Sequence, residues 1–173
     1  MGIGTFAYNV VYLIHLACVV VGFGSSFVYP VLAVKARKLP MREAFAVNHT
    51  ALEVSPYLTS YPIYGAGAAG LVLIGLSDQV YTFSQTWISA AFALYILALL
   101  VALFLHLPNL KAMDALQAKL VDGPELPAGS PAPPEVAEIE ERGQKAAMYG
   151  GLLHLFWLAL MIDMIWKPGF PSH

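Results

Sequence analysis

The chain is dominated by four long runs of apolar residues, separated by more polar segments. These runs cover about residues 6–34, 57–76, 87–107 and 146–166. A helix rises 1.5 Å per residue, so about 20 residues cross the hydrocarbon core of a bilayer, which is roughly 30 Å thick. The strands of a membrane β-barrel require polar and apolar residues to alternate, and these runs show no such alternation. The pattern predicts an all-α fold: a four-helix transmembrane bundle that forms a single integral membrane domain over residues 1–173.

The composition agrees with a membrane protein. Hydrophobic residues make up 58% of the chain and charged residues only 12%, against about 25% in soluble domains. The net charge of -2 excludes a polycationic surface for nucleic acid. The single cysteine, Cys18, excludes an internal disulfide. Because the first Lys or Arg is Lys35, no basic region precedes the first run, and we expect this run to be a retained span rather than a cleavable signal.

The distribution of basic residues predicts the orientation of the bundle. Eight of the nine Lys and Arg residues fall in the segments 35–56 and 108–145. They are Lys35, Arg37, Lys38, Arg42, Lys111, Lys119, Arg142 and Lys145. Segments rich in Lys and Arg stay in the cytoplasm. We therefore expect two cytoplasmic loops, 35–56 and 108–145, with the N- and C-termini on the outer, non-cytoplasmic side.

The second of these loops contains a proline-rich linker. Residues 122–135 read DGPELPAGSPAPPE, with five prolines and two glycines, a composition that favours an extended chain. Before the linker, apolar residues at helical spacing predict one or two amphipathic turns. After it, acidic and basic residues four apart predict a solvated start of the fourth helix.

Small and polar residues form a stripe along one face of the first run. Its members are Tyr8, Tyr12, His15, Cys18, Gly22, Ser25 or Ser26, and Tyr29. We expect this face to point into the bundle, where small residues let helices approach closely. The second run carries glycines of the same kind: Gly65, Gly67, Gly70 and Gly75. Pro56 and Pro62 predict a kink or a short opening helix near its start.

Two histidines suggest a cofactor. His15 lies on the stripe, and His154 lies on the face of the fourth run that carries Gly150 and Gly151. Counted inward from the ends of their helices, the two imidazoles lie roughly 13 and 18 Å below the same boundary. Two neutral imidazoles at similar depth can ligate one haem iron axially. His15 and His154 are thus candidate ligands of haem b, the alternative being that each only bonds to a neighbouring helix.

Other polar side chains have simpler interpretations. His106 stands beside Pro108 at the end of the third run and is expected to cap that helix or to meet lipid head groups. Met161 and Met164 have the softness that copper(I) prefers, although methionines at this spacing also serve as packing residues. No nucleophile elbow, Cys-x-x-Cys, His-Glu-x-x-His or phosphate-binding loop is present in the sequence, so there is no positive case for an enzyme.

Three functions therefore remain open. The first is a non-catalytic accessory or structural subunit, whose glycine-rich helices bind other membrane-protein subunits within a larger complex. The second is a haem b electron-transfer protein with His15 and His154 as axial ligands. The third is a copper or small-solute transporter, for which the polar stripe would have to supply the path.

The order of three motifs resembles a known family. The first run reads LIHLACVVVGFGSSFVYP, the third reads WISAAFALYILALL followed by LPNLKAM, and the fourth ends in FWLALMIDMIWKPGF. This order is similar to that of uncharacterised four-span bacterial integral membrane proteins, a domain of unknown function, and more distantly to the membrane domain of copper resistance protein D. From the copper family only His15 matches. The resemblance implies a multi-pass protein of the bacterial cytoplasmic (inner) membrane and leaves its activity open.

Overall fold

The computed structural model describes residues 2–124 and 131–169, and its regular elements there are all helices. In chain order they are α1 (Phe6–Ser26), α2 (Val28–Ala36), α3 (Met41–Ser55), η1 (Pro56–Ser60), α4 (Tyr61–Leu76), α5 (Thr86–Val101), η2 (Ala102–His106), α6 (Leu107–Asp122) and α7 (Pro134–Trp166). The elements η1 and η2 are single turns of π-helix inside longer rods. Residues 125–130 of the predicted linker lie outside the described residues.

The elements join end to end into four long helical rods. These rods run from Phe6 to Ala36, Met41 to Leu76, Thr86 to Asp122 and Pro134 to Trp166. Each is long and apolar enough to cross a membrane, which confirms an all-helical protein with four candidate spans. With 31 to 37 residues the rods are about 45–55 Å long, well beyond the roughly 30 Å of a hydrocarbon core.

The extra length comes from segments that the sequence suggested were loops. Most of 35–56 is helix α3, and 108–145 contains most of α6 and the start of α7. The amphipathic turns expected after Pro108 are therefore part of a 16-residue helix. These extensions pack on one another, α2 on α3, α3 on α6 and α6 on α7, which explains why such polar segments are helical.

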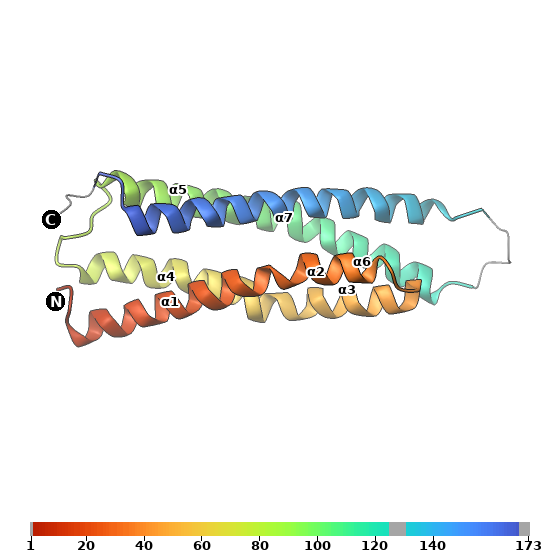
Figure 1. The fold of residues 1–173 in the computed structure, drawn as a ribbon, viewed down its shortest axis with the longest axis horizontal. Coiled ribbons are helices and arrows are strands. Elements are labelled where there is room, and N and C mark those ends of the chain that lie inside the picture. Colours follow the sequence, from red (N-terminus) through yellow and green to blue (C-terminus); the bar gives the residue numbers. More distant parts are fainter. Residues whose placement is uncertain (1, 125–130, 170–173) are drawn as a thin grey trace.

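The rods lie side by side along one axis (Figure 1). At one end of the bundle α1 packs against α4 and α5 against α7. The start of α1 and the end of α7 lie at this end, which we call the terminal end (Figure 1). The turn between α2 and α3, the end of α6 and the start of α7 lie at the opposite end, which we call the distal end.

Prolines shape the second rod, and serines satisfy the backbone that the prolines release. A proline has no N–H to donate to the carbonyl four residues earlier. The carbonyl released by Pro56 is that of Leu52, which accepts a 2.9 Å hydrogen bond from the Ser55 hydroxyl. The carbonyl released by Pro62 is that of Leu58, which accepts a 2.8 Å bond from Ser25 on α1. The expected kink thus takes the form of the π turn η1.

Most of the polar stripe of α1 packs against α4 and η1, as its composition predicts, but Tyr12 is 47% exposed. A Cβ atom added to Gly22 would lie 3.0 Å from Ile63, and one added to Gly65 would lie 3.0 Å from the Sγ atom of Cys18. Farther along, Thr59 donates a 3.2 Å hydrogen bond to the Tyr29 hydroxyl. These small residues are therefore engaged in contacts within the bundle.

Candidate functional site

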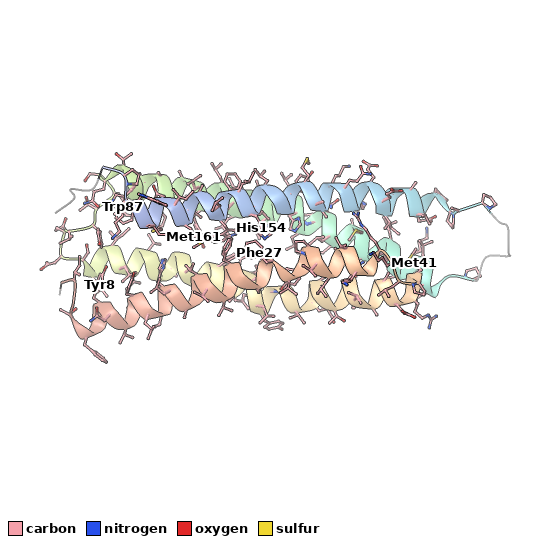
Figure 2. All side chains as sticks on the ribbon, viewed as in Figure 1. Tyr8, Phe27, Met41, Trp87, His154 and Met161 are labelled. Atoms are coloured by element: carbon pink, nitrogen blue, oxygen red, sulfur yellow. The ribbon has the colours of Figure 1, made fainter. Side chains whose placement is uncertain are left out.

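A large cavity lies between the rods in the distal half of the bundle. Its volume is about 1240 Å³, beyond the roughly 300–1,000 Å³ of common small-molecule pockets. Each helical element of the described chain lines it, α1 only through its last residue, Ser26. Most of the lining side chains are apolar. Phe27, Met41 and His154 all line it; Figure 2 shows Phe27 and His154 near the middle of the molecule and Met41 at the distal end. The cavity is therefore elongated along the bundle axis.

An aromatic floor closes the cavity towards the terminal end. Ile63, Tyr95 and Trp157 line it at this level. The Tyr95 hydroxyl donates a 3.1 Å hydrogen bond to the carbonyl of Ile63, which joins α5 to α4. The Trp157 side chain is buried and packs with Ala91 and Leu160 in the small core of the bundle.

His154 reaches the cavity from α7 in a defined orientation. Its Nδ1–H donates a 2.7 Å hydrogen bond to the carbonyl of Gly150, one turn earlier. This bond leaves Nε2 as the acceptor nitrogen of the neutral ring, and Nε2 lies 3.1 Å from the Ser26 hydroxyl oxygen. The imidazole also stacks obliquely on Phe27, with 4.7 Å between ring centres. The sequence identified His154 as a site residue, and the structure places it on the cavity wall.

His106 reaches the same cavity from the neighbouring rod, Thr86–Asp122, although the sequence analysis expected it to cap its helix or to meet lipid head groups. Its Nδ1 atom is buried and has no hydrogen-bond partner among residues 2–124 and 131–169. Its ring lies against Gly150, since a Cβ added there would be 3.8 Å from His106 Cε1. His106 and His154 thus both lie next to Gly150. The available signal was Pro108, because a proline loosens the preceding turn and π turns are common at functional sites.

His15 lies elsewhere. Its Nδ1–H donates a 2.8 Å hydrogen bond to the carbonyl of Ala66 on α4, and the residue does not line the cavity. On α1, His15 precedes Ser26, the partner of His154, by eleven residues, or about 16 Å of helix. The structure therefore does not bring His15 and His154 together. Their depths differ because α1 extends beyond the end of α7 at the terminal end (Figure 1), so that residue counts from the two ends do not start at one level.

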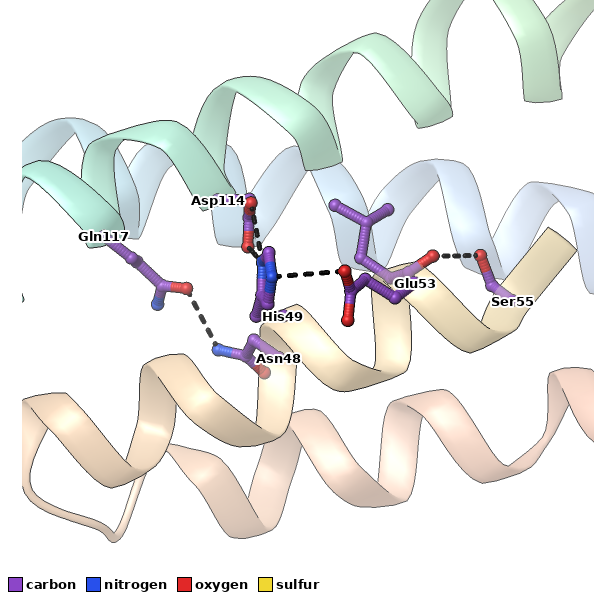
Figure 3. A network of polar contacts seen from close by, with 7 residues as sticks. Asn48, His49, Glu53, Ser55, Asp114 and Gln117 are labelled. Carbon is purple, nitrogen blue, oxygen red and sulfur yellow. Dashed lines mark hydrogen bonds and ion pairs between the residues drawn. The ribbon is translucent and has the colours of Figure 1, made fainter.

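A polar network joins α3 to α6 beside the distal part of the cavity (Figure 3). The Nδ1–H of His49 donates to the Asp114 carboxylate at 3.0 Å, and its Nε2 lies 3.5 Å from Glu53. The Asn48 amide donates a 3.3 Å hydrogen bond to Gln117. Over the described part of the chain, no cluster of three His, Cys, Asp or Glu side chains has the arrangement of a metal site. The network therefore holds α3 and α6 together.

The methionines proposed for copper lie away from the cavity. Met161 and Met164 belong to the terminal part of α7, and both side chains are more than a third exposed (Figure 2 labels Met161). Between them in sequence, Asp163 is only 8% exposed. Neither methionine lines the cavity that holds His106 and His154.

Comparison with protein-family models, with curated proteins and with solved structures finds no match to this chain.

Proposed function

We propose that this protein is a multi-pass membrane protein that binds an apolar small molecule in the cavity between its helices. The proposal rests on one observation: a large, mostly apolar cavity lies between the helices, and the imidazoles of His106 and His154 are part of its lining. The buried Nδ1 atom of His106 has no hydrogen-bond partner among the described residues, and such an unpaired buried polar atom is unusual outside functional sites. Ligand sites are typically of this kind, mostly apolar with a few convergent polar groups.

The two π turns strengthen this proposal. Both interrupt long apolar rods, and both line the cavity, η1 with Thr59 and Ser60, and η2 with Ala102, Leu103 and His106. A π turn widens a helix at a cost in regular hydrogen bonding and is frequent at functional sites. Two of them around one cavity favour a binding role over simple packing.

We further propose that the bundle lies in a bacterial cytoplasmic membrane with its termini outside. The eight basic residues of 35–56 and 108–145 lie in the distal parts of the rods or, for Arg37 and Lys38, in the distal turn between α2 and α3, and the positive-inside rule assigns that end to the cytoplasm. Single cysteines introduced at Gly4 and at Ala137, in a Cys18→Ala background, test this orientation in intact cells. A membrane-impermeant maleimide should label the first and not the second; the reverse pattern would invert the topology.

The accessory-subunit hypothesis has less support from the geometry. It rested on small residues suited to close helix contact, and Gly22, Gly65, Gly67 and Gly70 face side chains of neighbouring helices in the same chain. These four glycines serve close packing within the bundle. Gly75 has nothing within 4 Å, so it stays open to a partner helix.

Haem b is a second candidate ligand, favoured by the meeting of two imidazoles at Gly150. Axial ligation would fall to His106 and His154 rather than to His15 and His154, because only the former pair lines one cavity. The Nδ1–H bond of His154 to a backbone carbonyl is the support that ligating histidines commonly have. A reduced-minus-oxidised spectrum of the purified protein should then show a b-type signal that His106→Ala removes and His15→Ala retains. A flat spectrum from folded protein rules out haem.

A bulky residue placed in the cavity tests the main proposal. Ala147 lines the cavity, whereas Met148, its neighbour on α7, is 61% exposed and does not. We expect Ala147→Trp to displace a co-purifying apolar molecule, detected by native mass spectrometry in mild detergent, and Met148→Trp to retain it. If the wild type carries no such molecule and takes up none, or if both variants behave alike, the proposal fails.

A further inference from the structure

We infer that the molecule bound in this cavity is an amphiphile: an apolar chain with an anionic head group, carboxylate or phosphate, that binds Arg37. This inference rests on the proposed function and specifies the chemistry of its ligand. It follows from the position of Arg37, from the state of the acidic side chains near it, and from the length of the apolar cavity beyond it.

Arg37 is the sole Lys or Arg among the described residues that line the cavity. It follows α2 directly, and its backbone N–H closes that helix by donating to the carbonyl of Ala33. Its side chain extends across to α7, where Nη2 would lie 3.8 Å from a Cβ atom at Gly143. Within the part of the chain that the structure describes, no carboxylate pairs with this guanidinium.

The two acidic side chains of the lining leave that guanidinium available. Asp114 is engaged by His49, at 3.0 Å. Glu140, one turn before Gly143, lines the cavity but lies beyond 4 Å from Arg37, the limit for an ion pair. Arg37 is an exposed residue at the distal end of the cavity, so its guanidinium is open to a group that enters there. Guanidinium groups bind carboxylate and phosphate oxygens in a planar, bidentate way, which makes an anion of this kind the matching partner.

The cavity beyond Arg37 is long enough to hold an acyl chain. Along α7, Gly143 beside Arg37 precedes Gly150 beside His106 by seven residues, and Gly150 precedes Trp157 on the floor by seven more. Each step corresponds to about 10 Å of helix. A charged group at Arg37 would therefore have about 20 Å of mostly apolar wall between it and the floor. Free fatty acids and anionic phospholipids both combine these two features.

Quenching of Trp157 by brominated chains tests the inference with matched probes. Trp157 lines the floor, and the Trp157→Phe protein gives the background from the other two tryptophans. The probes are 9,10-dibromostearate and its uncharged methyl ester, added to purified protein in non-ionic detergent. We expect the acid to quench Trp157 at concentrations at least tenfold below those of the ester. Arg37→Gln should abolish this preference, and Lys38→Gln, which removes the same charge from a residue outside the lining, should keep it.

Two further arms assign the source of the anion. Brominated phosphatidylglycerol and brominated phosphatidylcholine replace the fatty acid and its ester. Quenching by the phospholipid pair that depends on Arg37 identifies a membrane lipid, and dependence only in the fatty-acid pair identifies a free fatty acid. Glu140→Gln should strengthen the preference for the anion in either case, because it removes a negative charge from the lining of the same cavity.

The possible results test the anionic head group and the apolar cavity separately. Equal quenching by acid and ester in wild type, with no effect of Arg37→Gln, overturns the anionic head group and leaves an apolar-ligand cavity in place. Equal losses in Arg37→Gln and Lys38→Gln also overturn it, since general surface charge would then be the cause. Absence of Trp157 quenching by every probe contradicts the cavity itself, provided that circular dichroism shows the protein folded.

Discussion

The Nδ1–H of His15 donates a 2.8 Å hydrogen bond to the backbone carbonyl of Ala66, across the contact between α1 and α4. Gly70, one turn beyond Ala66, makes room for the ring, since a Cβ there would lie 3.6 Å from His15 Cε1. A histidine inside a membrane helix is usually a functional candidate. Here its donor nitrogen is already satisfied, which makes His15 a packing residue of α1 and α4.

His15→Leu should therefore weaken the fold and spare the cavity. The substitution removes one interhelical hydrogen bond, worth about 0.6–1.7 kcal/mol in membrane proteins. Thermal unfolding in detergent should shift down by a corresponding amount, while the molecule that co-purifies with the protein remains bound. His106→Ala should show the converse pattern, with ligand lost and stability little changed. Loss of ligand in His15→Leu at wild-type stability would contradict this division of roles.

The four spans, the proline kink and the inward stripe of α1 could be predicted because each depends on local sequence. Hydrophobic length and the missing N–H of proline act within one helix. The pairing of His15 with His154 could not be judged in this way, because depth depends on how far α1 extends past α7. Helix α3 was missed for a similar reason: its sequence is mixed in polarity, and packing on α2 and α6 supports it.

Gly67 should be intolerant of any side chain. A Cβ atom at this position would overlap the ring of Tyr95, whose hydroxyl is fixed by the carbonyl of Ile63. Overpacking of this kind costs about 1–3 kcal/mol. Gly67→Ala should lower the unfolding temperature, and Gly75→Ala, on the same helix with nothing within 4 Å, should leave it unchanged or raise it. Equal unfolding temperatures of the two variants would show that the contact between Gly67 and Tyr95 adjusts to an added methyl group without a loss of stability.

Ser25 and Pro62 should be energetically coupled. The Ser25 hydroxyl donates to the Leu58 carbonyl that Pro62 releases, so Ser25→Ala should leave that carbonyl unsatisfied and cost about 1 kcal/mol. In a Pro62→Ala background the helix supplies its own N–H to Leu58, and the same serine substitution should cost less. A double-mutant cycle on thermal unfolding measures the difference. Additive effects would mean that the serine is not compensating for the proline.

The His49–Asp114 contact should hold the distal ends of α3 and α6 together. Asp114→Ala removes a bond between the two helices, whereas Glu53→Ala removes a contact of His49 within α3. Hydrogen exchange of the α3 amides should accelerate in the first variant and stay close to wild type in the second, since only the first frees the helix from its neighbour. Faster exchange in both variants would show that α3 is stabilised by side-chain pairs within the helix, such as His49–Glu53, as well as by its contact with α6.

The buried carboxylate of Asp163 should lower the stability of the fold. Its side chain is 8% exposed, and its Oδ2 atom has no hydrogen-bond partner within the described part of the chain. An ionised carboxylate in such a place carries an uncompensated desolvation cost, which a neutral amide of the same shape largely avoids. Asp163→Asn should therefore raise stability by about 1 kcal/mol, read as a higher unfolding temperature in detergent.

Asp78 provides the matched control for this prediction. It is exposed in the turn between α4 and α5, with a positive φ of 56° that asparagine also accepts, so Asp78→Asn should leave the unfolding temperature unchanged. A lower unfolding temperature for Asp163→Asn than for wild type would show that the buried carboxylate binds a cation or proton that stabilises the fold. Because Asp163 lies at the terminal end of α7 and neither Asp163 nor Asp78 lines the cavity, neither variant should change what the cavity binds.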